Sequence, residues 1–394
     1  MARRVLLLHN TPKARRYFRT LQSGIDELDI HTAAIGIRWQ GAANCLPAAC
    51  VDEVCDYTMR RKWARERIPS WRLRALEHSH RRVARWHIND VWRRIESLKP
   101  DAVAVWGGQS VDVASALFAA DRLGVERYIF ECGLLPNTTT CDPVGVNADN
   151  SIPQDPQFYA RYNKSAAWPQ NLLPRPSRRR VDAAQRLPKR YLFIPLQVRL
   201  DSQVLLYSPW IRNMRHLVQV VLEAARDGLQ HSDVELVFKR HPSCTQDYAD
   251  LERLFQALGC ARFADGNSTQ ELIDHALGVV TINSTVGLES VLLNRPVMTL
   301  GRACYAIPGV AAQARSVAEL AQWMRMADAG ELPAATHREA FINYLLNDYC
   351  IPAHHKAPTQ EHFRRLSERL KQHPGARRRA QPAAQRWQWS WNLG

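Results

Sequence analysis

Two carboxylates in the sequence stand just after apolar runs of strand length. Glu131 follows the run 128–130, and Asp201 follows Gln197 in a loop after the run 191–195. Glycosyl transfer with retention of configuration needs two such groups, one at the anomeric carbon and one for the acceptor proton. A single loop carboxylate, however, more often caps a helix or pairs with a cation. The two carboxylates therefore indicate catalysis only in combination with other groups.

A basic cluster follows another predicted strand. Lys239, Arg240 and His241 stand in a row, and Pro242 after them rigidifies the turn and keeps a helix from starting early. Cations at the end of a strand can hold a phosphate and stabilise its departure as a leaving group. A solvated basic loop explains the cluster at least as well when the cluster is considered alone.

A further cluster combines a strand end with small hydroxyl side chains. The predicted strand ends at Ile282, and Ser284 and Thr285 open the helix that follows. A helix N-terminus offers free backbone N–H groups and the positive end of the helix dipole, so it favours an anion such as a nucleotide phosphate. The alternative is a plain N-cap, because Ser and Thr are common at that position.

All of these groups depend on elements that alternate between strand and helix. Apolar runs predict strands at 5–9, 31–37, 102–106, 128–130, 191–195, 234–238, 278–282 and 297–300. Amphipathic patterns predict helices at 60–99 (with a break near Pro69), 210–227, 247–258, 286–293, 316–327 and 359–372. Such alternation predicts parallel α/β sheets, and 394 residues suit two domains. The predicted fold is α/β, with two Rossmann-like doubly wound domains and a ligand cleft at the C-terminal strand ends.

The domain boundaries follow from composition. Residues 169–190 are rich in Pro and Arg and lack apolar periodicity, which is typical of a linker. The prediction is an N-terminal acceptor-side domain at 1–168, a linker at 169–190, a nucleotide-sugar domain at 191–345, and a C-terminal helix with a basic, Trp-rich tail at 346–394.

Composition narrows the class of protein. With 46% hydrophobic and 23% charged residues the chain is globular, and its net charge of +15 attracts anions. The nine cysteines are odd in number and form no CxxC pair, and the five-residue spacing of Cys45, Cys50 and Cys55 is not typical of zinc sites. The prediction is reduced thiols and no metal. No signal peptide and no apolar run of roughly 18 residues is present, which predicts a cytoplasmic protein.

Taken together, the clusters resemble the capsule polysaccharide biosynthesis family of bacterial β-Kdo glycosyltransferases. The matching motifs are Glu131-x-Gly133, Gly145-Val146-Asn147, Pro195-Leu196-Gln197, Asp201-Ser202-Gln203, Lys239-x-His241-Pro242 and Asn283-Ser284-Thr285-Val286-Gly287-Leu288-Glu289. The resemblance covers about residues 106–309, and the order and strand-end placement of the motifs make it specific. It departs at Leu135-Pro136, where the family often has Arg before the Pro, which bears on contacts to the acceptor or to the Kdo carboxylate.

The resemblance implies a GT-B-like, metal-independent enzyme that transfers Kdo from CMP-β-Kdo with retention and uses no cofactor. By position, Asp201 is implied as the carboxylate at the anomeric carbon and Glu131 as the acid/base for the acceptor hydroxyl. His241 is implied as a catalytic ligand of the CMP phosphate or the Kdo carboxylate. Implied donor-binding residues are Gln197, Lys239, His241, Ser284, Thr285 and Glu289. Implied acceptor or Kdo contacts are Asp142, Asn147 and Arg199.

The resemblance also implies an acceptor and a location. The single catalytic module resembles the capsule enzyme that adds the first Kdo to a phosphatidylglycerol-type lipid, so we expect a peripheral protein on the inner face of the inner membrane. Other capsule assembly proteins are further candidate partners. Arg and Trp recur at 60–94 and 377–391. That mixture favours contact with an anionic membrane, although the Trp side chains could instead pack into the domain cores.

Three other interpretations remain open at this point. A transferase or epimerase of the same fold could use a UDP-sugar. A basic protein with interleaved aromatics could bind nucleic acid without catalysis, but the sequence carries no recognisable nucleic-acid motif, and we predict no nucleic-acid partner. A non-catalytic protein of capsule assembly or of the membrane surface is the third.

Overall fold

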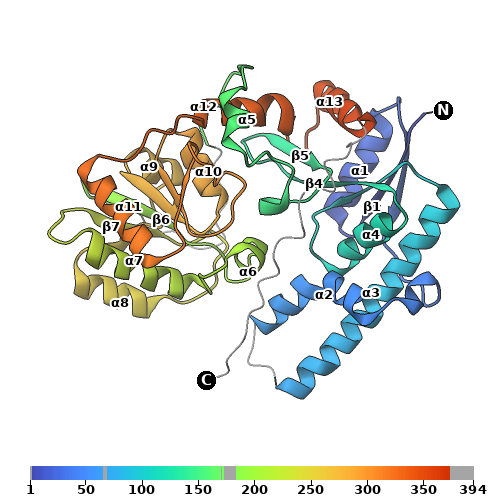
Figure 1. Cartoon of the computed structure of the whole chain (residues 1–394), viewed down its shortest axis with the longest axis horizontal. Coiled ribbons are helices and arrows are strands. Elements are labelled where there is room, and N and C mark those ends of the chain that lie inside the picture. Colours follow the sequence, from blue (N-terminus) through green and yellow to red (C-terminus); the bar gives the residue numbers. More distant parts are fainter. Residues whose placement is uncertain (1, 65–68, 170, 173–182, 373–394) are drawn as a thin grey trace.

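The strands form where apolar runs are long enough to be buried on both faces. In β1 (Arg4–His9) the four central residues are buried, and in β3 (Ala102–Trp106) and β6 (Tyr191–Pro195) every residue is. Such continuous burial is typical of central parallel strands covered by helices on both sides. The computed structural model describes residues 2–64, 69–169, 171–172 and 183–372, which form two α/β units side by side (Figure 1).

The first unit has a six-stranded sheet in the order β12-β5-β4-β3-β1-β2. Strands β2 (Asp29–Ala34), β1, β3 and β4 (Glu126–Cys132) are parallel, whereas β5 (Thr138–Asp142) and β12 (Ile351–Pro352) continue the sheet with antiparallel pairings. The helices of this unit are α1 (Pro12–Gly24), α2 (Ala48–Trp63), α3 (Ser70–Leu98), α4 (Val111–Arg122) and α13 (Gln360–Lys371), with short α5 (Pro156–Ala160) beyond β5.

The second unit has a six-stranded, wholly parallel sheet in the order β11-β10-β9-β6-β7-β8. Its further strands are β7 (Glu235–Lys239), β8 (Ala261–Phe263), β9 (Gly278–Thr281), β10 (Val297–Thr299) and β11 (Ala312–Gln313). Its helices are α6 (Ser202–Tyr207), α7 (Met214–Gly228), α8 (Ala249–Leu258), α9 (Thr269–Asp274), α10 (Thr285–Leu292), α11 (Val317–Ala329) and α12 (Arg338–Tyr344). The strand order reverses between β6 and β9, which is the topological switch point where doubly wound sheets bind ligands. The predicted α/β fold with two Rossmann-like units is confirmed.

The C-terminal segment returns to the first unit rather than extending the second. β12 pairs with β5, and α13 buries Leu366 and Leu370 in the core of the first unit. The Tyr128 hydroxyl donates a hydrogen bond of 2.7 Å to the Gln372 carbonyl. Residues 351–372 therefore complete the first sheet and one of its helical faces. Half of the predicted linker (170 and 173–182) and the predicted Trp-rich tail (373–394) lie outside the described residues.

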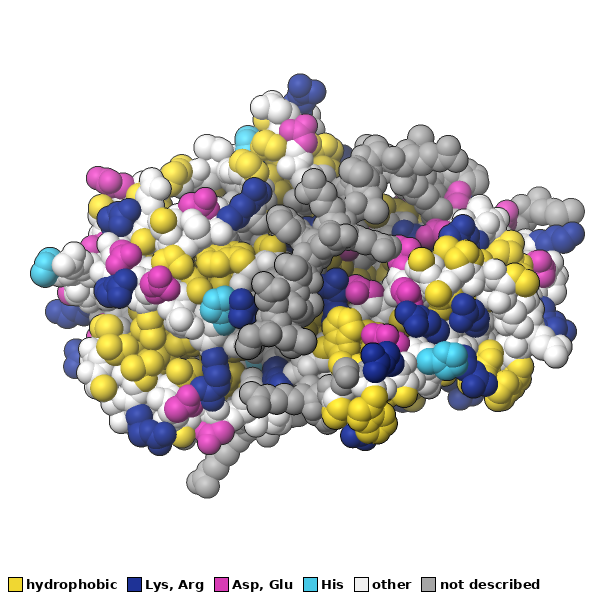
Figure 2. Space-filling view, turned by 60° about the horizontal axis from the view of Figure 1, so that its bottom comes forward, with side chains coloured by type: hydrophobic (Ala, Val, Ile, Leu, Met, Phe, Trp, Pro, Cys, Tyr) yellow, Lys and Arg dark blue, Asp and Glu magenta, His cyan; other side chains and the backbone are white. Residues whose placement is uncertain are grey.

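Helices α2 and α3 form an arm on the first unit, and the predicted break near Pro69 is confirmed. Trp92 packs against the core, and Trp86 lies against Trp39 with ring centroids 4.2 Å apart. Trp63 and Trp71, at the adjoining ends of the two helices, are 41% and 66% exposed. Figure 2 shows dark-blue Lys and Arg side chains beside yellow hydrophobic ones on this side of the first unit.

Within the described ranges, none of the helices combines the length and the apolar character that crossing a bilayer requires.

Candidate functional site

Two buried amides lie at the switch point of the second sheet. Gln197 follows β6 and Asn283 follows β9, and their side chains are 3% and 1% exposed. Gln197 Nε2 donates to Asn283 Oδ1 at 3.1 Å. Asn283 Nδ2 in turn donates to the carbonyls of Gln203 at 2.9 Å and Arg302 at 3.2 Å. These hydrogen bonds therefore fix the orientation of both amide side chains.

Asp201 joins this network at its open side. It caps α6, because its Oδ1 accepts from the Gln203 N–H at 2.9 Å, and its Oδ2 accepts from Gln197 Nε2 at 3.4 Å. Burial raises the pKa of Tyr57 on α2, and the negative charge of Asp201 raises it further. The half-buried Asp201 carboxylate thus lies close to the first unit, where a substrate between the units would reach it.

A cleft of about 430 Å³ separates the two units beside this network. The first unit contributes α2, the loop after β3 and the loop after β5, and the second contributes the end of α6 and Arg302. An ion pair of 2.9 Å between Arg302 and Asp149 crosses the cleft. Arg199, which is exposed, donates to the Ala64 carbonyl at the end of α2. The predicted inter-domain cleft is therefore present, with ionic contacts at its edges.

The basic cluster at the end of β7 forms most of its hydrogen bonds and ion pairs within the second unit. Lys239 Nζ donates to the carbonyls of Asp265, at 2.7 Å, and Asn267, and burial lowers its pKa. Arg240 pairs with Asp265 and, at 2.7 Å, with Glu252. The half-buried His241 ring accepts from the Ser243 N–H at 3.1 Å through Nδ1. The phosphate role predicted for Lys239 stays a prediction, because two of its three donors hold the loop 265–267.

The helix α10 begins beside the switch point. Ser284 is its N-cap and accepts from the Val286 N–H at 3.2 Å, and the Tyr305 hydroxyl donates to the Ser284 carbonyl. Gly287 is required here, because a Cβ on it would lie 2.3 Å from that hydroxyl oxygen. Thr285 and Glu289 are half-buried on the same helix. The plain N-cap reading of Ser284 therefore holds, and its contact with a phosphate stays a prediction.

Glu131 lies at the end of β4 in the first unit. Its Oε1 accepts from the Cys132 N–H at 2.9 Å. The following Gly133 fits because a Cβ there would collide with Thr138 at the start of β5. Glu131 and Asp201 do not hydrogen-bond to each other, so the two predicted catalytic carboxylates belong to separate edges of the two sheets.

The predicted acceptor contact of Asp142 needs correction. Asp142 is 1% exposed, and its oxygens accept from the N–H groups of Val144, Gly145 and Ser151 and from the hydroxyls of Ser151 and Tyr349. These five bonds, of 2.7 to 3.0 Å, fix the loop after β5. Asp142 is therefore a structural carboxylate, because no oxygen remains for a substrate.

Asn147, another predicted contact, is half-buried and adopts the left-handed conformation with φ 57°, which shapes the same loop at the edge of the cleft. Its contact with a substrate stays a prediction.

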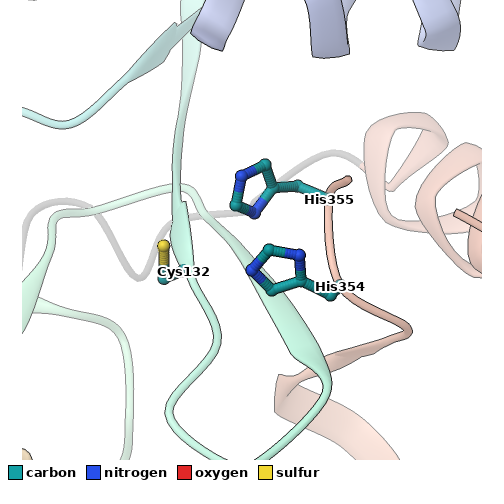
Figure 3. A group of neighbouring side chains, drawn as sticks. All are labelled: Cys132, His354 and His355. Atoms are coloured by element: carbon teal, nitrogen blue, oxygen red, sulfur yellow. The ribbon is translucent and has the colours of Figure 1, made fainter. Parts of the chain in front are cut away.

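Sequence reasoning missed several groups at these edges. Tyr57 and Asp149 carry no motif, and their proximity to the second unit depends on how the two units meet. Cys132, His354 and His355 were missed as well, although one ligand atom of each lies within 4.8 Å of the others (Figure 3). Cys132 is far in the chain from the adjacent pair His354 and His355, so no spacing rule could have found the group.

Comparison with known proteins bears on the second unit. Residues 177–351 match the model of the family described as capsule polysaccharide biosynthesis protein. Protein FixF of Sinorhizobium fredii is 34% identical over 251 residues, covering 63% of this chain and 60% of FixF. The capsule polysaccharide modification protein LipB of Neisseria meningitidis is 31% identical over 131 residues, covering 32% of this chain and 31% of LipB. The chain thus spans less than two thirds of the length of either relative.

Among solved structures, the β-Kdo 2,7 transferase of KpsC from Thermosulfurimonas dismutans aligns with 93% of this chain and 99% of its own, with 13% identity and a TM-score of 0.47. The predicted resemblance to capsule polysaccharide biosynthesis proteins is confirmed by the match over residues 177–351.

Proposed function

From the match of residues 177–351 to the capsule polysaccharide biosynthesis protein family, we propose that this chain is a retaining β-Kdo glycosyltransferase. It takes the sugar acid Kdo from CMP-β-Kdo and transfers it to a phosphatidylglycerol-type or lysophosphatidylglycerol-type lipid in capsule biosynthesis. The observation that carries the proposal is Asp201, which accepts from the buried Gln197 at the switch point and interacts electrostatically with Tyr57 of the other unit. The name of the KpsC neighbour, a β-Kdo transferase, agrees with this proposal.

Asp201 acts as the nucleophile. Its carboxylate attacks the anomeric carbon of Kdo, and the bond from that carbon to the phosphate oxygen breaks, with its electron pair leaving on CMP. The acceptor hydroxyl then attacks the same carbon, displaces Asp201 and gives its proton to Glu131. Two displacements at one carbon retain its configuration. The hydrogen bond from Gln197 fixes the orientation of Asp201 before the substrate arrives.

The leaving CMP phosphate is stabilised by groups of the second unit. His241 and the N-terminus of α10, with Ser284 and Thr285, follow neighbouring parts of the parallel sheet at its C-terminal edge. A helix N-terminus and a nearby cation favour the negative charge that develops on the phosphate. Lys239 acts mainly by holding the loop 265–267 beside His241, with its third donor directed to the donor substrate. We propose no metal and no cofactor for this step.

The acceptor reaches the cleft from the inner face of the inner membrane. Trp63 and Trp71 are exposed at the adjoining ends of α2 and α3, and the last turn of α2 carries Arg60, Arg61 and Lys62. Each cation near an anionic leaflet contributes about 1 kcal/mol of attraction, and Trp prefers the interface. Because α2 also lines the cleft, the same helix can rest on the membrane and lead to the donor.

The first test compares two carboxylates with the same structural role. Asp201 and Asp155 are both N-caps whose Oδ1 accepts from the N–H two residues on, at 2.9 Å. Asparagine caps a helix about as well as aspartate, so Asp201→Asn and Asp155→Asn both preserve the fold. We expect Asp201→Asn to lose at least ~10³-fold in CMP release from CMP-Kdo with a fluorescent lysophosphatidylglycerol, and Asp155→Asn to keep wild-type activity.

The product identifies donor and acceptor together. A wild-type product heavier by one Kdo supports the proposal. Full activity in Asp201→Asn contradicts the role of Asp201. Folded wild-type protein that is protected from thermal unfolding by UDP and not by CMP would point to a UDP-sugar instead.

A further inference from the structure

Three metal-ligating side chains gather at the end of β4, away from the switch point of the second sheet. Cys132 ends β4, and His354 and His355 follow β12 in the C-terminal segment. One ligand atom from each lies within 4.8 Å of the other two. Figure 3 shows both imidazole rings pointing from their loop toward the strand end that carries Cys132. Donors from two distant segments are thus brought within the span of one ion.

His355 gives an independent indication of a ligand. The residue is 5% exposed, and neither of its ring nitrogens has a hydrogen-bond partner within the part of the chain that the structure describes. Its ring packs against Trp106, with centroids 4.8 Å apart, and against Tyr17. Buried polar atoms are nearly always paired in native proteins, because an unpaired one has lost its water without replacement. A metal ion is a partner that an imidazole nitrogen can take.

The ligand atoms of the cluster suit a soft divalent cation, whereas the nearby Lys13 ammonium opposes any cation there. Neither ring nitrogen of His355 has a hydrogen-bond partner among the described residues, so the ring can offer a lone pair to a metal. Desolvation and Glu131 raise the pKa of Cys132, but a bound Zn²⁺ removes the proton from a coordinating thiol. Lys13 Nζ donates to Cys132 Sγ at 3.3 Å and lies over the Trp106 ring, a contact that a thiolate strengthens.

We propose that Cys132, His354 and His355 bind one Zn²⁺ ion, with the fourth tetrahedral position open to solvent beside the exposed Cys132. Thiolate and imidazole ligands suit Zn²⁺, and three protein ligands leave one position for water or for an anionic group. The ion ties the loop after β12 to the end of β4, next to Glu131. It takes no part in the transfer step proposed above, and its binding does not depend on that function.

The test measures zinc in the full chain. Protein freed of metal with a chelator receives one equivalent of ZnCl₂, is desalted and is analysed by mass spectrometry of the metal. The ligand variants are Cys132→Ser, His354→Gln and His355→Gln, and the control is Cys260→Ser, an exposed cysteine of the second unit. We expect about one zinc per chain in wild type and control, and at least ~10-fold weaker zinc binding in each ligand variant.

Cobalt identifies the ligands by spectroscopy. Co²⁺ loaded in place of zinc should give a thiolate-to-cobalt charge-transfer band in wild type and Cys260→Ser, and no such band in Cys132→Ser. Because Cys132 is exposed, this variant is expected to fold even if His355→Gln does not. Wild-type zinc far below one per chain, or zinc content unchanged in Cys132→Ser and His354→Gln, overturns the proposal.

Discussion

The two sheets differ in how their C-terminal edges hold polar groups. At the β6–β9 edge, Gln197 and Asn283 are buried and bonded to each other, and Asp201 is joined to them through Gln197. At the β4 edge, the backbone of Glu131 pairs with Thr140, while its carboxylate accepts from the N–H of the next residue, Cys132. The C-terminal segment nearby brings His355, whose ring nitrogens have no hydrogen-bond partner among the described residues. At the β6–β9 edge the polar side chains hydrogen-bond to one another. At the β4 edge the neighbouring polar groups come from a segment that lies more than 200 residues further along the chain.

This difference shows at which edge hydrogen bonds already orient a possible reacting group before a ligand binds. Preorganised hydrogen bonds fix a reacting group at no cost during the reaction, which suits the nucleophile proposed at the second sheet. The first sheet presents its carboxylate on a strand end with few local restraints. The hydrogen bonds of Gln197 and Asn283 therefore orient the donor side before a ligand binds.

The largest effect that tests this comparison is expected at Glu131. Glu131→Gln should lower the rate of Kdo transfer by about 10²- to 10⁴-fold, because the acceptor hydroxyl loses its general base. The first displacement at Asp201 does not need that base. Intact-mass and peptide analysis should therefore find Asp201 heavier by one Kdo in this variant under turnover conditions.

A matched control is Asp112→Asn, because the Asp112 carboxylate also accepts from the N–H of the next residue, at 2.9 Å. This control should keep its activity. Zinc content should stay unchanged in Glu131→Gln, since Glu131 is not a proposed ligand. Near-wild-type transfer by Glu131→Gln would remove the first sheet from the chemistry and leave the second sheet as the whole active site.

A smaller effect is expected for the proposed membrane contact of helices α2 and α3 in the first unit. The double variant Trp63→Ala, Trp71→Ala should bind vesicles containing phosphatidylglycerol several-fold more weakly, because two interfacial rings are lost. Trp39→Ala is the control, since Trp39 is as exposed as Trp71, at 66%, but lies against Trp86 away from the helix ends. Sedimentation with the vesicles measures both. If Trp39→Ala weakened vesicle binding equally, any exposed aromatic ring of this surface would serve, and the specific role of Trp63 and Trp71 would be contradicted.

Much of the fold could be predicted from the sequence, because central parallel strands are continuous apolar runs. β3 and β6 were predicted with their observed bounds, and β1 and β9 to within one residue. The antiparallel edge was not predicted. β5 is a run of three threonines, Cys141 and Asp142, and β12 has two residues, so neither shows a pattern of its own. The return of the C-terminal segment to the first sheet depends on tertiary pairing, which local periodicity does not contain.

The candidate site divides in the same way. The placement of Asp201 near Gln197 and Asn283 could be predicted, because these residues follow β6 and β9, which both carry motifs. The catalytic role of Asp201 stays a prediction. The prediction that Asp142 contacts the acceptor or Kdo was wrong, because its place in a motif does not show whether the side chain is buried. Its oxygens accept five hydrogen bonds from within the protein. The phosphate contact predicted for Lys239 stays a prediction, and the sequence could not show that two carbonyls of the chain accept from its ammonium group. Cys132 and His355 meet only through the folded first unit.

The smallest expected effect is a pH dependence of stability that arises where the C-terminal segment packs against the first unit. His362 on α13 is fully buried, its Nδ1 lies 2.7 Å from the Pro352 carbonyl, and its Nε2 lies 2.8 Å from the Tyr17 hydroxyl. Burial lowers its pKa in the folded state, and Tyr17 and His355 are the titratable groups that face it. The unfolded chain therefore binds the proton first, and stability falls as the pH drops below about 6.5.

His362→Gln should remove this contribution, so the melting temperature should decrease less between about pH 7.5 and pH 5.5 than in wild type. Burial also lowers the pKa of His355, which adds to the wild-type slope, so the difference between the two slopes is the informative quantity. The exposed His275→Gln in the second unit is the control and should keep the wild-type slope. Identical slopes in His362→Gln and wild type would mean that the contact between α13 and α1 does not respond to protonation, and that the two units share one acid sensitivity.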